Sequence, residues 1–402
     1  MRIARILTRL NLGGPARQVL ASDPLLLAGG HEIRLFAGRP EPGEGDLCER
    51  AKERGIDVRR VKSLARGLNP LRDLKGRSEL AHELAAFDPD VIHTHAAKAG
   101  ALGRSAGWAA TRAPLVHTFH GHVLEGYFPR VVSRRMAAFE RRWARRCSRV
   151  IAVSERTAED LVRLDVVERR EVEVVPPGIE LDEFARLSSL AEPACLRKRE
   201  ARGALELDPS AFVVLFLGRL APIKRPTLAL AAFAKLHERI PEARMIFAGD
   251  GRERVELERA CARLPEATRD AVRLLGAVED VLPLHAASDV CLSSSRNEGL
   301  PVALIEAAAA ARPSVAIGVG GIPELVVDGV TGLCIRSDAT DRELVEGLSG
   351  GLLELALSSE RRAALGQAAR ERALTRHGAG VLAGALEAVY TSAVREGRRQ
   401  AS

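Results

Sequence analysis

The chain has 402 residues, 46% hydrophobic and 28% charged, which is typical of a globular protein with two ordinary domains. No apolar run reaches the roughly 18 to 20 residues of a membrane-spanning helix, and the opening MRIARILTRLNLGG lacks the long apolar core of a secretory signal. Most of the net charge of +7 belongs to residues 1–185, with 31 Lys and Arg against 25 Asp and Glu, so an acidic partner is expected there.

Short β-rich runs alternate with helical patterns in the first half. The runs RIARIL, EIRLFAG, DVIHTH, PLVHTFH and RVIAVS predict buried strands of a parallel sheet, each followed by a helix. Residues 186–209 are less regular and predict a linker. The pattern then restarts with FVVLFLGRL, ARMIFAGDG, VRLLGAV, DVCLSS, PSVAIGVGG and GLCI.

These alternations predict an α/β protein with two doubly wound halves. We expect an N-terminal domain over residues 1–185, a linker over 186–209 and a second domain over 210–377. A final helix is expected within 378–402. Ligands of such sheets bind at the carboxyl ends of the strands, so the default site is the cleft between the halves.

The cysteines and histidines give little indication of a metal. Six cysteines are scattered without a CxxC spacing, which argues against zinc and against disulfides and fits a reducing cytoplasm. His93, His95 and His117 sit in strands, where packing or turn bonding is the simpler interpretation. His120 and His122 flank Gly121, where a strand gives way to a loop, and His120 has the stronger functional case.

The stretch NEGLPVALIEA places Glu298 and Glu306 eight residues apart around a predicted helix start at Pro301. Gly299 and Leu300 would present backbone N–H groups at that start, an arrangement that binds anions. Two carboxylates beside it could grip the hydroxyls of a sugar. A solvated pair of surface glutamates is the alternative.

Two further loops follow strands of the second half. FLGRLAPIKRP brings Arg219 and Lys224 to the end of a strand, where they could neutralise a diphosphate. FAGDGRE supplies Gly249 and Asp250 in a glycine turn that lets backbone approach a flat base, although many loops have this pattern.

The combination of GR…K, E-x7-E and GGIPELV…G.TGL resembles glycosyltransferase family 4, over nearly the whole chain. The N-terminal NLGGPARQV, HTHAAKAGALGR and HTFHGHV resemble members that build bacterial capsular polysaccharides, exopolysaccharides or lipid-linked glycans. The resemblance implies the GT-B fold, with two Rossmann-like domains facing across a cleft. It also implies that the C-terminal helix crosses back to the first domain.

The resemblance also implies roles for individual residues. Glu306 would hold the donor ribose, and Glu298 would face the donor hexose. Arg219 and Lys224 would stabilise the leaving diphosphate in place of a metal ion. The remaining implied positions are Gly13 and Gly14, which would close against the phosphates and acceptor, and His120, which would lie beside the transferred sugar.

The implied enzyme is a retaining, metal-independent hexosyltransferase without a cofactor. Its donor would be a nucleotide sugar, expected to be UDP-linked. Its acceptor would be a glycan or a polyprenyl-diphosphate-linked glycan of surface polysaccharide assembly. Lys98 and His122 are candidates on the acceptor side, although Lys98 could equally be solvated.

Residues 130–149 predict a basic helix, with Val132, Met136, Phe139, Trp143 and Cys147 at helical spacing. This apolar stripe is most simply core packing. The seven arginines on the other faces are a solvated surface or an attraction to anionic lipid. From them we expect a cytoplasmic protein that associates peripherally with the inner membrane surface.

Two other functions compete with sugar transfer. A GT-B UDP-sugar 2-epimerase would share the architecture and the nucleotide, but GR…K together with E-x7-E favours transfer. A nucleic-acid-binding protein would fit the pI near 9.4. The aromatic content of 3% and the lack of a recognisable reading module argue against it.

Overall fold

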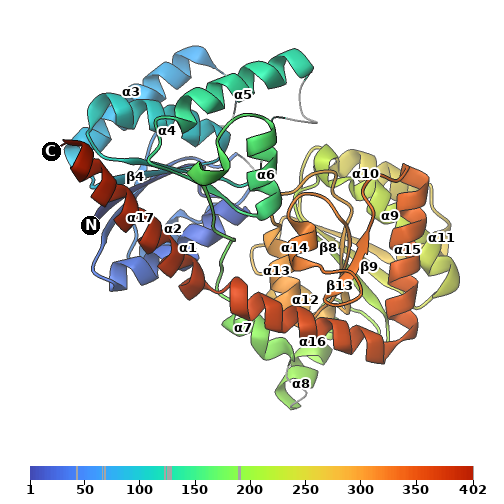
Figure 1. Cartoon of the computed structure of the whole chain (residues 1–402). Helices are drawn as coiled ribbons and strands as arrows, with labels where there is room; N and C mark the ends of the chain where they lie inside the picture. Colours follow the sequence, from blue (N-terminus) through green and yellow to red (C-terminus); the bar gives the residue numbers. More distant parts are fainter. Residues whose placement is uncertain are drawn as a thin grey trace. The chain divides into compact units, whose positions relative to one another are not determined.

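The computed structural model forms two compact units, Met1–Ile179 with Ala379–Ser402 (unit 1) and Glu180–Gly378 (unit 2) (Figure 1). It describes the chain except residues 42–43, 66, 68, 122–123, 125–128, 189–191 and 402. The side chains of residues 130, 188, 192–195 and 398–401 are also outside the description.

Unit 1 is built on a seven-stranded parallel sheet of order β3-β2-β1-β4-β5-β6-β7. The strand order reverses between β1 and β4, as in doubly wound nucleotide-binding folds. The strands are β1 (Arg2–Arg9), β2 (Glu32–Gly38), β3 (Asp57–Arg60), β4 (Val91–His95), β5 (Leu115–Phe119), β6 (Arg149–Ala152) and β7 (Val172–Val174).

Helices cover both faces of this sheet, because residues that alternate along each strand face opposite layers. Ile3 on β1 packs with α17, whereas Ala4 packs with α3 and α4. The helices are α1 (Gly14–Ala28), α2 (Cys48–Glu53), α3 (Pro70–Phe87), α4 (Ala96–Ala110), α5 (Arg130–Ala144), α6 (Glu155–Arg163) and α17 (Ala379–Ala401), with a 3-10 turn at Arg169–Glu171.

The C-terminal helix α17 crosses back to unit 1 and lies beside α1 (Figure 1). Leu386, Val389 and Tyr390 of α17 are buried against the sheet. Arg149 at the start of β6 holds the end of α17 through Glu396, with one Nη1–Oε2 distance of 2.6 Å. The last helix is therefore part of the core of unit 1.

Unit 2 repeats the architecture with a six-stranded parallel sheet of order β10-β9-β8-β11-β12-β13. Its order reverses between β8 and β11. The strands are β8 (Val213–Leu217), β9 (Arg244–Ala248), β10 (Val272–Gly276), β11 (Val290–Ser293), β12 (Ser314–Ile317) and β13 (Gly332–Ile335).

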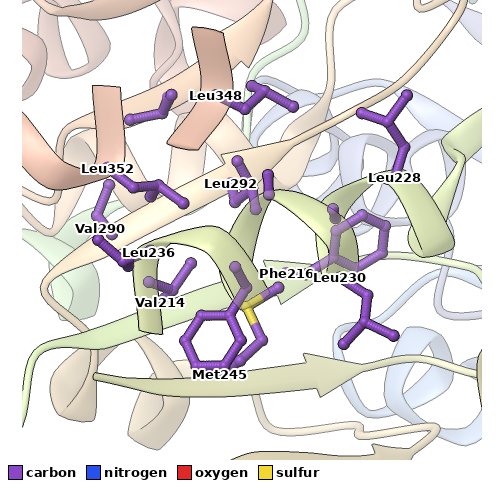
Figure 2. Close-up of a cluster of buried hydrophobic side chains, with 14 of the residues drawn as sticks. Val214, Phe216, Leu228, Leu230, Leu236, Met245, Val290, Leu292, Leu348 and Leu352 are labelled. Atoms are coloured by element: carbon purple, nitrogen blue, oxygen red, sulfur yellow. The ribbon is translucent and has the colours of Figure 1, made fainter. Parts of the chain in front are cut away.

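The core of unit 2 has two layers that share the sheet. Val214 and Phe216 of β8 pack under α9 and α15 with Leu236 and Leu348 (Figure 2), and Leu215 faces the other layer. The helices are α7 (Asp182–Ala185), α8 (Glu192–Ala204), α9 (Pro226–Arg239), α10 (Arg254–Ala262), α11 (Glu266–Asp270), α12 (Leu282–Ala287), α13 (Val302–Ala309), α14 (Ile322–Leu325), α15 (Asp341–Leu357) and α16 (Ser359–Arg376), with 3-10 turns at Arg186–Ser188 and Pro222–Lys224.

The region predicted as a linker, residues 186–209, lies in unit 2 and contains helix α8. Arg202 of α8 is buried, and its Nη2 donates to Asp289 Oδ2 at 2.7 Å. Lys198 reaches the other oxygen, Oδ1, at 2.7 Å. Charges at helical spacing therefore dock α8 on unit 2, although its few apolar residues gave no helical period in the sequence. Strands β3 and β7 were also not predicted.

Helix α5 differs from the predicted basic helix in its length and in its buried face. It ends at Ala144, and Arg149 belongs to β6. Val132 and Phe139 of the predicted apolar stripe are 41% and 42% exposed. Met136 and Cys147 of the stripe are partly buried and pack against the core, and the buried residues of α5 are Ala137, Glu140 and Ala144. Glu140 is buried because Arg104 Nη2 of α4 donates to its Oε2 at 2.6 Å, a pairing that hydrophobic periodicity cannot reveal.

Candidate functional site

The loops that follow β8 and β11 meet at the carboxyl edge of the sheet of unit 2. These strands are neighbours at the reversal of strand order, the place where doubly wound sheets bind ligands. The Ser294 hydroxyl contacts the carbonyl oxygens of Lys224 at 2.8 Å and of Arg225 at 2.9 Å. The Arg296 N–H donates to the Ile223 carbonyl at 2.8 Å. These hydrogen bonds therefore tie the two loops together.

Lys224 and Glu298 form an ion pair across these loops. The side chains are 24% and 11% exposed, so both charges lie near the surface without being fully solvated. Ser295 Oγ donates to the same carboxylate oxygen, Glu298 Oε1, at 2.6 Å. Both of these contacts use Oε1. No described residue donates to Oε2, which can therefore accept further hydrogen bonds.

Glu306 lies about one turn into α13 and is 2% exposed. Its Oε2 is 3.5 Å from Nε2 of His285, a fully buried side chain of α12. Burial, followed by the Glu306 carboxylate, raises the pKa of the Cys291 thiol on β11 to about 12, while Lys224 acts in the opposite direction.

Two glycines hold the loops of this edge at close approach. Gly249 follows β9 with φ of +143°, and a Cβ there would lie 1.9 Å from the Gly218 carbonyl oxygen. Gly320 follows β12 with φ of +54°, and a Cβ there would lie 1.7 Å from the Glu298 carbonyl oxygen. Contact between loops therefore requires both glycines, whether or not a flat base stacks near Gly249.

The other predicted residues of unit 2 occupy the same loops. Arg219 is exposed directly after β8, and Asp250 follows β9, where its Oδ1 accepts from the Gly251 N–H at 2.7 Å. Gly299 and Leu300 are buried just before α13. The sequence predicted that this helix starts at Pro301, whereas Pro301 is its N-cap and Val302 is its first residue.

In unit 1, Gly13 is the N-cap of α1 and Gly14 is its first residue, just beyond β1. Lys98, in the first turn of α4, is paired with Asp73 of α3. Its Nζ also donates to the Gly67 carbonyl at 3.2 Å. His122 lies outside the described residues.

His120 follows β5 and is partly buried, and its Nε2 is 2.9 Å from Nδ1 of His95 on β4. His95 Nε2 is 3.0 Å from Nη2 of Arg5, a buried residue of β1 that is paired with the buried Asp23 of α1. Burial, with a smaller effect of the Arg5 charge, lowers the pKa of His120 to about 3. This imidazole is therefore neutral at pH 7.

His93 and His117 complete a group of four buried or partly buried imidazoles. His93 contacts Tyr390 OH of α17 at 2.6 Å and Thr118 Oγ1 at 2.7 Å. Burial is the main cause that lowers the pKa of His93, His95 and His117 well below the usual value. The packing role predicted for these three histidines agrees with their burial.

Two family models match the chain: Glycosyltransferase Family 4 over residues 12–183 and Glycosyl transferases group 1 over residues 211–352. The D-inositol 3-phosphate glycosyltransferase of Kribbella flavida is 32% identical over 327 residues, which cover 74% of this chain and 69% of that protein. The chain belongs to glycosyltransferase family 4.

Another curated relative in this family is the D-inositol 3-phosphate glycosyltransferase of Mycobacterium sp. (strain JLS). It is 33% identical over 273 residues, 64% of this chain. That alignment spans 58% of the relative's own length.

Solved structures support the GT-B fold that the family resemblance implied. Anabaena Alr3699/HepE, solved with UDP and glucose, is 21% identical, with a TM-score of 0.81 over 98% of this chain and 100% of that chain. WaaG, a glycosyltransferase involved in lipopolysaccharide biosynthesis, is 19% identical, with a TM-score of 0.73 over 95% and 98%. At these identities the likeness concerns the fold.

The family motifs do not include five residues that shape the two candidate sites. Ser294 and Ser295 lie in the SSS run after β11, and His285 lies on α12. Arg5 and Asp23 are charges within an apolar strand and an apolar helix, a pattern that could have marked them as a buried pair.

The described residues include neither a metal-binding cluster nor a membrane-spanning helix. No three His, Cys, Asp or Glu side chains there are grouped so that they could hold a metal ion. No helix in the described part of the chain is long and apolar enough to cross a membrane.

Four buried or partly buried histidines have a lowered pKa, namely His93, His95, His117 and His120. They predict that unit 1 loses stability in mild acid. Below pH about 6.5 the unfolded chain binds protons that the folded unit does not, so stability falls as the pH falls. Between pH 7.5 and 5.5 each group lowers the free energy of unfolding by about 1.4 kcal/mol, which is about 5 kcal/mol for the four together. Urea unfolding of unit 1 from pH 7.5 to 5.5 measures this slope.

His120→Gln should remove about a quarter of the slope, since it deletes one of the four groups. A urea midpoint of unit 1 that stays constant between pH 7.5 and 5.5 would contradict the prediction.

Proposed function

We propose that this protein is a retaining hexosyltransferase that uses a UDP-linked sugar and needs no metal ion. The observation that carries the proposal is the Lys224–Glu298–Ser295 arrangement where the strand order of unit 2 reverses. It combines a cation for a diphosphate with a carboxylate for sugar hydroxyls. The complex of HepE with UDP and glucose supports a UDP-sugar donor for a protein of the same fold.

Departure of a nucleoside diphosphate builds negative charge on the leaving oxygens. Lys224 and Arg219 would stabilise this charge, a role that fixed cations perform without the solvent reorganisation of bulk water. Lys224 would then lie between Glu298 and the phosphates, and the Ser295 hydroxyl would keep Glu298 in place. Glu298 Oε2 would accept from a hexose hydroxyl, and the buried Glu306 would accept from the ribose.

In unit 1, Gly13 and Gly14 would face phosphates at the N-terminus of α1, where backbone N–H groups favour anions. His120 would contact the sugar as a neutral group, because its pKa of about 3 excludes proton transfer as an imidazolium near pH 7. Lys98 could reach an acceptor only after releasing Asp73.

For the acceptor we propose a phosphate-bearing hydroxyl compound, specifically a polyprenyl-diphosphate-linked glycan of surface polysaccharide assembly. The basic excess of residues 1–185 favours an anionic acceptor. The curated relatives are named for D-inositol 3-phosphate, so a soluble cyclitol or sugar phosphate is the second candidate. Parallel assays with radiolabelled UDP-glucose and each acceptor would distinguish them.

Glu298→Gln and Lys224→Ala should each lower kcat by about 100- to 1,000-fold, because each removes a group aimed at the reacting sugar or at the leaving diphosphate. The measurement is transfer from UDP-sugars in the presence of EDTA, which also tests whether a metal is needed.

Lys235→Ala and Glu346→Gln are matched controls, because they alter an exposed Lys–Glu pair between α9 and α15. Both controls should retain activity. Near-normal turnover of the two site variants, or loss of wild-type transfer in EDTA, would remove the corresponding assignment.

Glu306→Gln should weaken donor binding by about tenfold or more, since a hydrogen bond to a charged group contributes about 1.5–3 kcal/mol. Calorimetric titration with UDP-glucose measures the affinity, with Glu346→Gln as the control. An affinity for UDP-glucose that is unchanged in Glu306→Gln would exclude the ribose role.

Thermal shifts with UDP-, GDP- and ADP-glucose would identify the base, since a ligand that binds only the folded state stabilises it.

We also propose that the exposed face of α5 binds anionic membrane lipid at the cytoplasmic surface. The only acid of the helix, Glu140, is turned inward to Arg104, and Arg134 and Arg135 are exposed beside Val131, which is 63% exposed. Such a mixture of cations and apolar side chains suits the lipid headgroup region.

Arg134→Glu with Arg135→Glu should weaken flotation with anionic vesicles by about tenfold or more, since each basic residue contributes about 1 kcal/mol at such a surface. Arg252→Glu with Arg259→Glu makes the same change in net charge on unit 2 and should leave flotation unchanged. Equal flotation with anionic and zwitterionic vesicles would end the proposal.

A further inference from the structure

The starting point is a continuous chain of hydrogen-bonding groups through the interior of unit 1. It runs from Asp23 of α1 through Arg5 of β1 and His95 of β4 to His120 after β5. Asp23, Arg5 and His95 are 0%, 1% and 3% exposed, and His120 is the member nearest the surface. These hydrogen bonds pass from β1 to β4, the two neighbouring strands between which the strand order of the sheet reverses.

The direction of each hydrogen bond follows from the guanidinium of Arg5, which can only donate. Its Nη2 lies 3.0 Å from His95 Nε2, so that nitrogen must accept. A neutral imidazole has one donor and one acceptor, and the proton of His95 is therefore on Nδ1. His95 Nδ1–H then donates to His120 Nε2 at 2.9 Å. His120, also neutral, must carry its proton on Nδ1.

Neighbouring groups keep the directions of these hydrogen bonds from reversing. Asp23 Oδ1 accepts from Arg5 Nη1 and, at 3.1 Å, from the Ser22 hydroxyl, which holds the guanidinium in place. The other groups that face the chain are the imidazoles of His93 and His117 and the Tyr390 hydroxyl of α17. Burial lowers the pKa of both imidazoles and raises that of Tyr390, so these three groups are neutral near pH 7. The Arg104 charge, which also lowers the pKa of His117, is paired with Glu140.

We propose that Arg5 and His95 are positioning residues that fix His120 as an Nδ1–H tautomer, so that it acts as a permanent donor to a substrate oxygen. This inference rests on the proposed function for the identity of the substrate. No described residue accepts from His120 Nδ1, and the proposal gives this N–H a substrate oxygen as its acceptor. A fixed neutral donor stabilises an oxygen that gains negative charge, without giving up its proton.

The direct test needs no substrate, and the tautomer is observed in the unsubstituted protein. Protein labelled with ¹⁵N-histidine is observed by long-range ¹H–¹⁵N NMR, which distinguishes protonated from unprotonated ring nitrogens, and the His120 signals are assigned by their loss in His120→Gln. We expect one tautomer, protonated on Nδ1, that does not titrate between pH 8 and 6. Protonation on Nε2, a mixture of tautomers or a midpoint near pH 6.5 would overturn the inference.

A pair of variants separates positioning from stability. His95→Phe removes the link to His120, and His93→Phe removes two comparable buried hydrogen bonds two residues away on the same strand. Both variants should lower Tm. Only His95→Phe should release the tautomer of His120 and reduce kcat/KM, by about 10- to 100-fold as for other supporting partners of functional histidines.

The outcomes also separate this inference from the proposed function. If His120 is a single Nδ1–H tautomer but no UDP-, GDP- or ADP-sugar is turned over, the positioning stands and the proposed function fails. If transfer is observed and both variants lose equal activity with an unchanged His120 spectrum, the proposed function stands and the positioning role fails.

Discussion

The candidate donor site depends on the reversal of strand order between β8 and β11. Adjacent parallel strands whose helices leave in opposite directions create an opening at their carboxyl ends, and the loops there must be held without a helix between them. In unit 2 this is done by the Ser294 hydroxyl, which contacts the carbonyls of Lys224 and Arg225, and by Gly320, which admits the Glu298 backbone. The Lys224–Glu298 pair can form only because these backbone contacts fix both loops.

The pairing of Lys224 with Glu298 also decides how the site can respond to a ligand. In a fully buried pair, the free-energy cost of desolvating the two charges would exceed the favourable interaction with an incoming diphosphate. In a fully solvated pair, the attraction between the two charges would be weak. Exposures of 24% and 11% lie between these limits. In the proposed donor complex Lys224 would turn to a phosphate, while Ser295 would still donate to the Glu298 carboxylate.

The alternation of strands and helices predicted the α/β class and most strands, because buried parallel strands are continuous apolar runs that turn residues delimit. The motifs also selected Lys224 and Glu298, which the structure brings together. Helix α8 and the buried face of α5 were missed for one physical reason. Both are held by buried ion pairs, Arg202–Asp289 and Arg104–Glu140, and hydrophobic periodicity does not detect charged residues in a core.

The hydrogen bonds of Ser295 and the Arg5–His95–His120 chain were missed because they depend on which loops and strands become neighbours. Sequence separations of 25 and 90 residues within that chain give no local pattern. Only the strand order β1-β4-β5 brings the three residues together.

The two units solve opposite electrostatic problems with the same strand order. At the reversal in unit 2, the Lys224–Glu298 pair lies near the surface, where a charged ligand could exchange for an existing partner. At the reversal in unit 1, the buried Arg5 lies beside neutral imidazoles, so the polar groups there gain direction rather than charge. The Tyr390 hydroxyl of α17 contacts His93, beside this chain of hydrogen bonds, at 2.6 Å. Helix α17 therefore covers a polar group of the interior of unit 1 as well as an apolar face.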